Sequence, residues 1–260
     1  MPAAHTVVSP DWRVVDLISD LHLHSGDQAT FECWRRYLLA PQPEAEAVFI
    51  LGDLFEVWWG DDVLDSTSAG EAAFLRECAA VLQRAAQQRP VHFLHGNRDF
   101  LVGERFFAHT GVRALTDPCT LQLNTHRFVL SHGDTWCLGD VDYQRFRAEV
   151  RSAAWQSRFL AQPVAQREAT ALALRQQSEA RKHSGATYAD VDGPAAIAAL
   201  TEHQANVLVH GHTHQPADHP LAPGLTRHVL SDWDAMASPP RAEVLRLHDD
   251  GRVQRLPLLQ

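Results

Sequence analysis

Five short apolar runs in this chain each end in polar residues of the kinds that bind metals or phosphate. Runs of this length, bounded by glycine and polar residues, are typical of buried β-strands. The runs and the segments that follow them are Val14–Ile18 before Asp20-x-His22, Ala47–Leu51 before Gly52-Asp53, Val91–His95 before Gly96-Asn97, Arg127–Ser131 before His132, and Asn206–His210 before Gly211-His212-x-His214. Because ligands gather at the carboxyl ends of strands in layered α/β folds, the five segments are predicted to converge on one site.

Helical patterns separate these runs, at residues 30–39 and 68–88 and from Pro194 to Leu200. The second begins with Ser68 and Glu71 in the spacing of a capping box, which predicts Ser68 as its N-cap. The tail changes to strand patterns, at residues 226–230, 241–247 and 253–256. Strands that alternate with helices, followed by a strand-rich tail, predict a layered, mixed α/β fold.

Residues 140–186 interrupt this alternation with a segment that carries no clear strand pattern. Basic residues outnumber acidic ones here, against a net charge of −9 for the whole chain, and the segment holds the only lysine, Lys182. We predict a helical insertion within a single domain that spans residues 1–260. The pattern fits equally a cover over a bound molecule and an ordinary pair of surface helices.

The composition excludes several classes of protein. An acidic chain repels phosphate backbones, so no nucleic-acid partner is expected, and no protein partner is evident. None of the four cysteines is spaced C-x-x-C, which predicts reduced, mostly buried thiols in a cytosolic protein. The first ten residues lack the regions of a signal peptide, and no apolar run approaches the ~20 residues that span a bilayer. We expect a soluble protein, or one that rests on a membrane surface.

The polar groups that are predicted to converge are oxygen and imidazole donors without a thiolate. This mixture suits Mn²⁺, and also Fe²⁺, Co²⁺ or Zn²⁺. Seven groups are too many for one ion and suit two, which a shared carboxylate would hold ~3.5–4 Å apart. A lone strand-end histidine is more often structural, but here all five segments occur in order. The predicted metal ligands are Asp20, His22, Asp53, Asn97, His132, His212 and His214.

The residues that flank these segments are predicted to support the site rather than to bind metal. This group includes His24, His95 and His210. Asp99 and Asp134 are placed to orient ligating histidines. Trp58 and Trp59 either line a substrate groove or lie in the core, and the core is at least as well favoured.

The segments resemble the five sequence blocks of the calcineurin-like metallophosphoesterases. The blocks read Asp20-x-His22, Gly52-Asp53, Gly96-Asn97-Arg98-Asp99, His132-Gly133-Asp134 and Gly211-His212-Thr213-His214. The resemblance implies an αββα sandwich, with two sheets face to face, helices outside and the helical insertion as a lid. It also implies two Mn²⁺ ions per chain, with Asp53 bridging them. Asp20, His22 and His214 would complete one metal site, and Asn97, His132 and His212 the other.

Arg98 stands where most members of that superfamily have histidine. Arginine cannot release a proton at working pH, so Arg98 cannot act as a general acid. It can stabilise negative charge on a phosphoryl transition state. That role suits a leaving group that needs no protonation, such as a phosphate that leaves from a pyrophosphate. The predicted catalytic residues are Arg98 and its neighbour Asn97.

Longer blocks, at residues 16–23, 52–62, 96–101 and 132–135, resemble one branch of the superfamily, the UDP-2,3-diacylglucosamine diphosphatases of lipid A biosynthesis. The resemblance implies that a metal-bound hydroxide attacks the α-phosphorus and releases UMP and 2,3-diacylglucosamine 1-phosphate. It implies that the insertion covers acyl chains. It also implies that the protein is cytoplasmic and peripheral on the cytoplasmic face of the inner membrane.

The resemblance implies a set of substrate contacts, namely Asn97, Arg98, Asp140, Ser178 and His212. The branch usually shows an asparagine and a lysine beyond Ser178, where this chain reads Glu179–Gly185. Whether Arg181 or Lys182 takes over these contacts stays open. Two alternatives remain. One is a metallophosphoesterase that acts on a soluble nucleotide phosphodiester or diphosphate. The other is a non-catalytic metal-bound scaffold, although scaffolds usually lose ligands and none is missing here.

Overall fold

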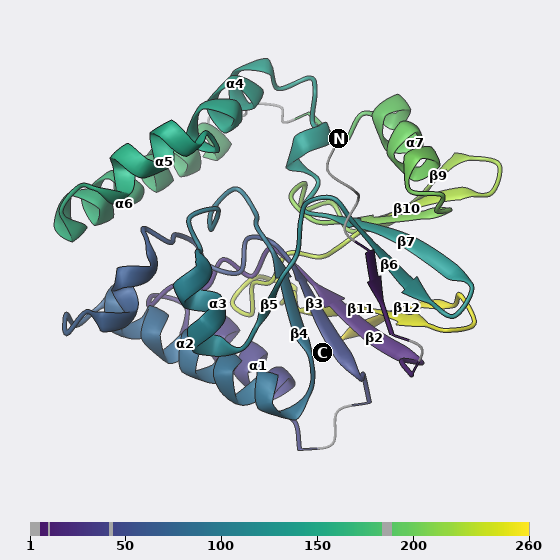
Figure 1. Cartoon of the computed structure of the whole chain (residues 1–260), viewed down its shortest axis with the longest axis horizontal. Helices are drawn as coiled ribbons and strands as arrows, with labels where there is room; N and C mark the ends of the chain where they lie inside the picture. Colours follow the sequence, from purple (N-terminus) through teal and green to yellow (C-terminus); the bar gives the residue numbers. More distant parts are fainter. Residues whose placement is uncertain (1–5, 10, 42–43, 184–188, 260) are drawn as a thin grey trace.

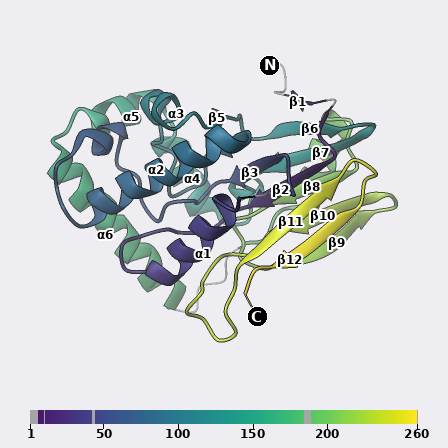
Figure 2. The same cartoon turned by 90° about the horizontal axis from the view of Figure 1, so that it is seen from below.

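Two six-stranded sheets lie face to face in the computed structural model, with helices on both outer faces (Figure 1, Figure 2). One sheet has the strand order β12-β11-β2-β3-β4-β5, and the other has the order β1-β6-β7-β8-β10-β9. The structure describes residues 6–9, 11–41, 44–183 and 189–259, with backbone only for 175–183. The arrangement confirms the mixed α/β sandwich that was predicted from the sequence.

The elements follow the predicted alternation of strands and helices. The first sheet consists of β2 (Val14–Ile18), β3 (Ala47–Leu51), β4 (Val91–Leu94), β5 (Arg113–Ala114), β11 (Glu243–His248) and β12 (Val253–Pro257). The second consists of β1 (Thr6–Val8), β6 (Cys119–Leu123), β7 (His126–Ser131), β8 (Val207–His210), β9 (Ala217–Ala222) and β10 (Leu225–Val229). The helices are α1 (Gln28–Leu38), α2 (Glu71–Gln88), α3 (Glu104–Thr110), α4 (Val141–Val150), α5 (Ala153–Leu160), α6 (Val164–His183) and α7 (Gly193–Glu202), with short 3-10 helices η1 (Asp61–Asp65) and η2 (Asp134–Trp136).

Strand β3 shows how the sandwich uses a continuous apolar run. Successive side chains of a strand point to opposite faces, and here both faces are covered. Ala47, Phe49 and Leu51 pack between the two sheets, whereas Val48 and Ile50 pack on the helix side. All five residues are buried. The unbroken hydrophobicity of the run therefore follows from its central position in the fold.

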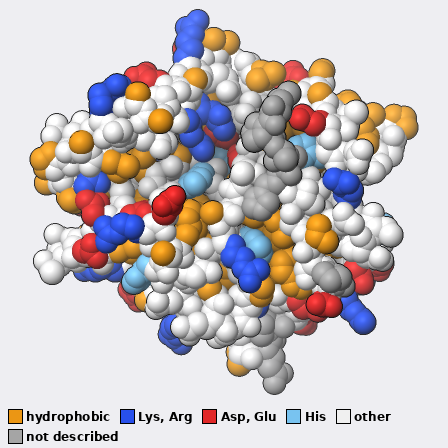
Figure 3. Space-filling view, in the orientation of Figure 1, with side chains coloured by type: hydrophobic (Ala, Val, Ile, Leu, Met, Phe, Trp, Pro, Cys, Tyr) orange, Lys and Arg blue, Asp and Glu red, His pale blue; other side chains and the backbone are white. Residues whose placement is uncertain are grey.

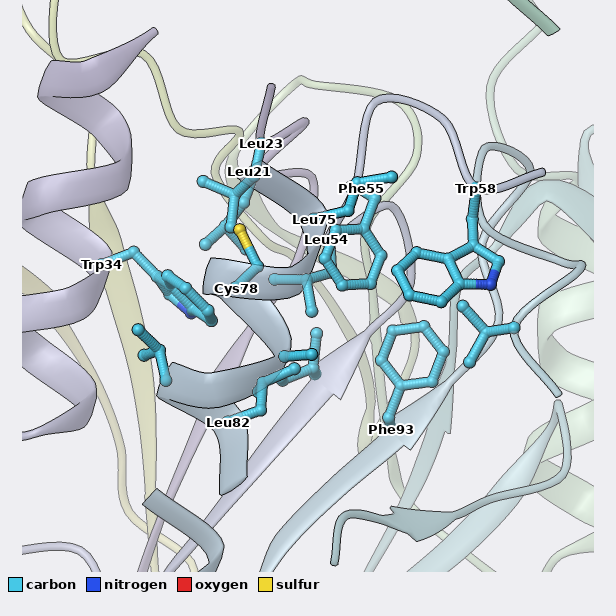
Figure 4. Packing of buried hydrophobic residues seen from close by; sticks show 14 of the residues in the cluster. Leu21, Leu23, Trp34, Leu54, Phe55, Trp58, Leu75, Cys78, Leu82 and Phe93 are labelled. Carbon is cyan, nitrogen blue, oxygen red and sulfur yellow. The ribbon is translucent and has the colours of Figure 1, made fainter. Parts of the chain in front are cut away.

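Helices α1 and α2 cover the outer face of the first sheet. Leu75, Cys78 and Leu82 of α2 pack in one cluster with Trp34 of α1 (Figure 4). Burying a leucine side chain contributes roughly 1.5–3 kcal/mol, so this layer is a main source of stability. Trp58 lies in the same cluster, with its ring 4.8 Å from that of Phe55. Trp58 and Trp59 are thus core residues, which is one of the two positions that the sequence left open.

Helix α2 begins differently from the prediction. Its N-cap is Gly70, with φ 69° and no side-chain cap, so the predicted capping box of Ser68 and Glu71 is wrong. The Glu71 carboxylate instead accepts hydrogen bonds from the Ser25 amide and hydroxyl, at 3.1 and 2.6 Å. The Glu71 side chain therefore binds the loop after β2 and does not cap its own helix.

The four cysteines are all buried as free thiols. Burial raises the pKa of the Cys137 thiol to about 12. A thiol that stays protonated at neutral pH is a poor nucleophile and a poor metal ligand. The reduced, buried thiols predicted from the sequence are confirmed.

Candidate metal centre

The predicted metal ligands lie beyond the carboxyl ends of β2, β3, β4, β7 and β8, at one end of the sandwich. Strands β2, β3 and β4 are parallel neighbours in one sheet, and β7 and β8 are parallel neighbours in the other. The His212 amide donates a hydrogen bond to Asp20 Oδ2 at 2.9 Å and so joins the loops of the two sheets. The structure therefore brings the five predicted segments together.

Five of these seven residues have a left-handed backbone conformation. The φ angles are 56° at Asp20, 48° at His22, 50° at Asp53, 68° at His212 and 52° at His214. Residues other than glycine adopt this conformation at a cost of order 1–3 kcal/mol, and it persists where the surrounding structure enforces it. The left-handed conformation turns the chain just past the strand end, so that the side chains of residues two apart, such as Asp20 and His22, point toward the same site. Such concentrated strain is typical of functional sites.

One group of these side chains consists of Asp20, His22 and His214. The two imidazole Nε2 atoms lie 3.2 Å apart. Asp20 Oδ1 lies 3.3 Å from His214 Nε2 and 3.9 Å from His22 Nε2. This oxygen is buried and has no hydrogen-bond partner of good geometry among the described residues. An orphaned carboxylate oxygen that faces two imidazole nitrogens fits a divalent cation.

A second group gathers around Asn97. Its Oδ1 atom lies 2.9 Å from His132 Nε2 and 2.8 Å from His212 Nδ1. Asp53 connects the two groups, because Oδ1 lies 3.6 Å from His132 Nε2 and Oδ2 lies 3.8 Å from His22 Nε2. A carboxylate with one oxygen toward each group is the arrangement that a two-metal site needs. The donor set fits the two cations that the sequence predicts, and the ligand roles stay predictions.

Negative charge dominates the electrostatics of this buried site. Burial alone would lower the pKa of His132, but the charges of Asp53, Asp20 and Asp134 outweigh it and raise that pKa to about 9. Burial alone would raise the pKa of Asp20, but His214 and the other nearby histidines outweigh it and lower that pKa. Protonated histidine balances the carboxylates here, which is a role that divalent cations can take over.

The histidines are oriented by groups that the sequence analysis did not assign. The Leu51 carbonyl lies 2.9 Å from His132 Nδ1. A Glu56 oxygen lies 3.0 Å from His22 Nδ1, and an Asp232 oxygen lies 3.8 Å from His214 Nδ1. A hydrogen-bond partner such as the Leu51 carbonyl fixes which ring nitrogen faces the metal. The two carboxylates act on their histidines through charge and proximity, because His22 Nδ1 has no hydrogen bond of good geometry among the described residues and 3.8 Å is too long for one. Asp232 follows β10 as the predicted ligands follow their strands, so the same strand-end signal could have found it.

Asp99 and Asp134 do not orient histidines as predicted. Asp99 accepts hydrogen bonds from the amides of Gly96 and Leu54, both at 2.8 Å, and thereby joins two of the loops. Burial, then the charge of Asp53, raises the pKa of Asp99 to about 7. Asp134 accepts from the Tyr143 hydroxyl at 2.5 Å and from Arg147 Nε at 2.7 Å. Asp99 is hydrogen-bonded to backbone amides, and Asp134 is hydrogen-bonded to side chains of the insertion, so neither carboxylate is paired with a histidine in the described contacts.

The flanking histidines pack beside the site, in agreement with the sequence. His95 Nε2 lies 2.7 Å from the Val102 carbonyl, and His210 Nδ1 lies 2.8 Å from the Gly211 carbonyl. His24 Nδ1 accepts from the Gly26 amide at 3.1 Å. Burial lowers the pKa of His210 to about 4, so this ring is neutral at physiological pH.

Glycine at positions 96 and 211 is required by the close approach of the loops. A Cβ atom on Gly96 would lie 2.1 Å from Asp53 Oδ1, and one on Gly211 would lie 1.8 Å from Ser19 Oγ. Neither neighbour can move away without disturbing an aspartate of the centre, since Asp20 Oδ2 is also within 2.2 Å of the second position. The Gly-Asn and Gly-His pairs of the sequence therefore reflect packing as well as chemistry.

Arg98 lies at the rim of the centre with little solvent exposure. Its amide donates to Asp53 Oδ1 at 2.8 Å. One guanidinium nitrogen lies 3.5 Å from Glu56, and the side chain is only 12% exposed. Arg98 is thus a mostly buried cation beside the predicted ligands, which differs from an ordinary surface ion pair.

Figure 1 shows the helices of the insertion beside one end of the sandwich, and side chains of α4 and its C-cap contact the loops of the centre. Arg151 donates to the Gly96 carbonyl at 2.9 Å, and the Tyr143 ring lies 5.6 Å from that of His212. Asp140 caps this helix and accepts a hydrogen bond from the Tyr143 amide at 3.2 Å. Arg167 of α6 donates to the Trp59 carbonyl at 2.7 Å. The sequence analysis did not single out Tyr143, Arg147, Arg151 or Arg167.

The remaining predicted substrate contacts lie at the end of α6. Ser178, Arg181 and Lys182 belong to its last turns, and their side chains lie outside the described residues. Their contacts with a substrate stay predictions.

The insertion exposes large apolar side chains. These are Val141 (53% exposed), Phe146 (40%), Leu160 (42%), Val164 (37%) and Leu174 (37%). Figure 3 shows hydrophobic side chains on these helices, at the upper left, close to basic ones. Among the described helices, none is both long enough and apolar enough to cross a bilayer. Exposed apolar residues that gather on one segment are typical of a surface that binds a partner or a lipid.

Comparisons of the sequence with known proteins identify its family. The calcineurin-like phosphoesterase profile matches residues 14–216. The UDP-2,3-diacylglucosamine hydrolase of Stenotrophomonas maltophilia is 40% identical over 90% of this chain and 94% of that protein. The enzyme of the same name from Bordetella pertussis is 41% identical over 90% of this chain and 92% of that protein. The structure of an archaeal phosphodiesterase superposes on 94% of this chain and on 99% of the phosphodiesterase chain, with 11% sequence identity and a TM-score of 0.47. The family match over most of the chain, together with the strand-end centre, shows that this protein belongs to the calcineurin-like phosphoesterases.

Proposed function

We propose that this protein hydrolyses the pyrophosphate bond of UDP-2,3-diacylglucosamine with Mn²⁺, and that it releases UMP and 2,3-diacylglucosamine 1-phosphate. The observation that carries the proposal is the gathering of all seven predicted ligands at one end of the sandwich, with Arg98 beside them. Relatives about 40% identical over 90% of the chain carry the name of this hydrolase.

The two groups of side chains would each hold one ion. Asp20, His22 and His214 would bind the first, and Asp53 would share its carboxylate with the second. Asn97, His132 and His212 would complete the second site. Two bound Mn²⁺ ions would neutralise charge on the pyrophosphate and lower the pKa of a coordinated water toward neutrality.

Arg98 would stabilise charge on the phosphoryl group during the reaction. Protein surrounds this guanidinium on most sides, so its positive charge acts in a medium that screens less than water does. The leaving lipid phosphate needs no proton from a general acid, because its second pKa is near ~6. The absence of a histidine at this position therefore suits a pyrophosphate better than a simple alkyl ester.

The insertion would bind the acyl chains and the inner membrane face. Its exposed apolar residues offer a surface for hydrocarbon, and arginines on the same helices suit an anionic headgroup. These residues favour a lipid substrate over a soluble nucleotide. The complete donor set favours an enzyme over a non-catalytic scaffold.

The test is hydrolysis of UDP-2,3-diacylglucosamine in detergent by the purified protein, with UMP release followed in Mn²⁺ and in chelator. We expect release that depends on Mn²⁺. Cleavage of a generic phosphodiester without UMP release would leave the two-metal chemistry standing and overturn the lipid substrate. Two bound ions without hydrolysis of any phosphoester would support the scaffold instead.

A further inference from the structure

Glu56 is a buried carboxylate that the proposed mechanism has not used. It lies three residues beyond Asp53 and is only 6% exposed. Its amide donates to the Leu23 carbonyl at 3.1 Å, and Leu23 pairs with Phe55 as an isolated bridge. The backbone of Glu56 is thus fixed against the loop that carries Asp20 and His22. A buried acid is costly unless cations or donors compensate it, so its position calls for a reason.

The two oxygens of Glu56 face two different parts of the centre. Oε2 lies 3.0 Å from Nδ1 of His22, whose Nε2 points toward the first group of ligands. Oε1 lies 3.5 Å from a guanidinium nitrogen of Arg98. One buried side chain therefore lies beside both a predicted metal ligand and the predicted catalytic cation.

Asp232 provides a comparison on the other side of the first group. It lies 3.8 Å from His214 Nδ1, and Arg241 holds it through hydrogen bonds of 2.9 and 3.2 Å to Oδ2. The negative charge of Asp232 is therefore paired with Arg241, whose side chain is 40% exposed at the surface. The charge of Glu56 is directed instead at a cation inside the site.

We infer that Glu56 is a positioning residue that couples the first metal site to Arg98. By facing Nδ1 of His22 at 3.0 Å it would hold this ring with Nε2 aimed at the ion. By facing the guanidinium it would hold Arg98 toward the phosphoryl group. The inference rests on the proposed function, because it takes the centre to hold metal and Arg98 to act on the substrate.

The first readout is metal binding without substrate. Glu56→Gln keeps the shape of the side chain and removes its charge. Calorimetric titration of the metal-free protein with Mn²⁺ is expected to show one of two sites weakened about 10- to 100-fold. Asp232→Asn, which removes the looser partner, is expected to weaken binding less.

The second readout is turnover at saturating Mn²⁺, in a double-mutant cycle with Arg98→Ala. Glu56→Gln is expected to lower kcat about 10-fold in the parent enzyme and to have little further effect once Arg98 is gone. The loss caused by Asp232→Asn is expected to multiply with that of Arg98→Ala, since the contacts of Asp232 run to His214 and Arg241.

Three results would overturn the inference. They are unchanged Mn²⁺ affinity in Glu56→Gln, losses from Glu56→Gln and Arg98→Ala that multiply, and a lower Tm as the sole effect, which would mark Glu56 as merely structural. A parent protein that binds no Mn²⁺ or hydrolyses no phosphoester would instead count against the proposed function. The two failures are therefore distinguishable.

Discussion

The metal-centre loops and the helical insertion meet at one end of the sandwich, but they are built in opposite ways. The loops are short, joined by backbone hydrogen bonds, and held in left-handed conformations at five of the predicted ligands. The insertion is attached through side chains, with Arg147, Arg151 and Arg167 donating hydrogen bonds and Phe159 packing in the core, and it leaves large apolar residues exposed. Chemistry that needs tight placement is built on sheet ends, whereas the surface that we propose to bind the lipid tolerates looser attachment.

The largest effect is expected from the residue shared by both ligand groups. Asp53→Ala should leave the protein folded and lower kcat by at least about 10³-fold, because metal ions contribute several kcal/mol of transition-state stabilisation. The measurement is UMP release beside the circular dichroism spectrum and Mn²⁺ stoichiometry. Full activity in a folded Asp53→Ala variant would refute the site assignment.

A smaller loss of kcat is expected from removing Arg98, at the rim of the metal centre. Arg98→Ala should keep both Mn²⁺ ions and lower kcat by about 10²–10³-fold, as removal of a transition-state charge partner does. Arg98→Lys is the matched control and should recover only part of the rate, because an ammonium lacks the planar fork. An unchanged kcat in Arg98→Ala would show that this cation has no part in the chemistry.

Substitutions of exposed apolar residues in the insertion should raise KM, and only for the lipid substrate. Phe146→Ser combined with Leu160→Ser removes apolar area that is exposed in the free protein. We expect KM for UDP-2,3-diacylglucosamine to rise about 10-fold, a cost of ~1.4 kcal/mol, because less hydrocarbon is buried on binding. Hydrolysis of a generic phosphodiester serves as the control. Equal losses on both substrates would mean that the insertion and the loops form one catalytic unit.

The smallest effect concerns the attachment of the insertion at low pH. The hydrogen bond from Arg167 lowers the pKa of Asp62, which opposes the effect of burial. A carboxyl with a lowered folded-state pKa stabilises above its unfolded pKa near ~3.9, and this contribution is lost as pH falls through the folded pKa. Asp62 is 40% exposed, so screening limits the effect to about 1 kcal/mol.

Proteolysis between pH 3 and 6 measures this attachment. We expect cleavage within the insertion to increase below pH ~4 in the parent protein. Asp62→Asn should already show the faster cleavage at pH 6, with a weaker dependence on pH. Identical profiles for the two proteins would indicate that apolar packing of Phe159 and Trp155, rather than the ion pair, holds these helices.

The strands that carry the site could be predicted because their signals are local. The run Ala47–Leu51 is apolar throughout since the structure buries both of its faces, and Asp53 follows where that strand ends. The strands β1, β5, β6 and β9 were missed. β1 and β5 have only three and two residues, and β9 contains a proline and no fully buried side chain. Short or exposed strands such as these three leave little hydrophobic pattern to read. This reason does not apply to β6, which has five residues, four of them buried.

By itself the sequence determined the order of the strands along the chain, the nature of the seven donors and their positions at strand ends. These follow from apolar periodicity and residue type, which act over a few neighbours. Only the tertiary structure decided which carboxylate faces which partner. Glu56 lies beside His22 and Arg98, and Asp99 accepts hydrogen bonds from backbone amides. Glu71 binds a distant loop and does not cap its own helix. Such choices depend on which donors the packed loops bring within about 3 Å, and a linear pattern does not contain that distance.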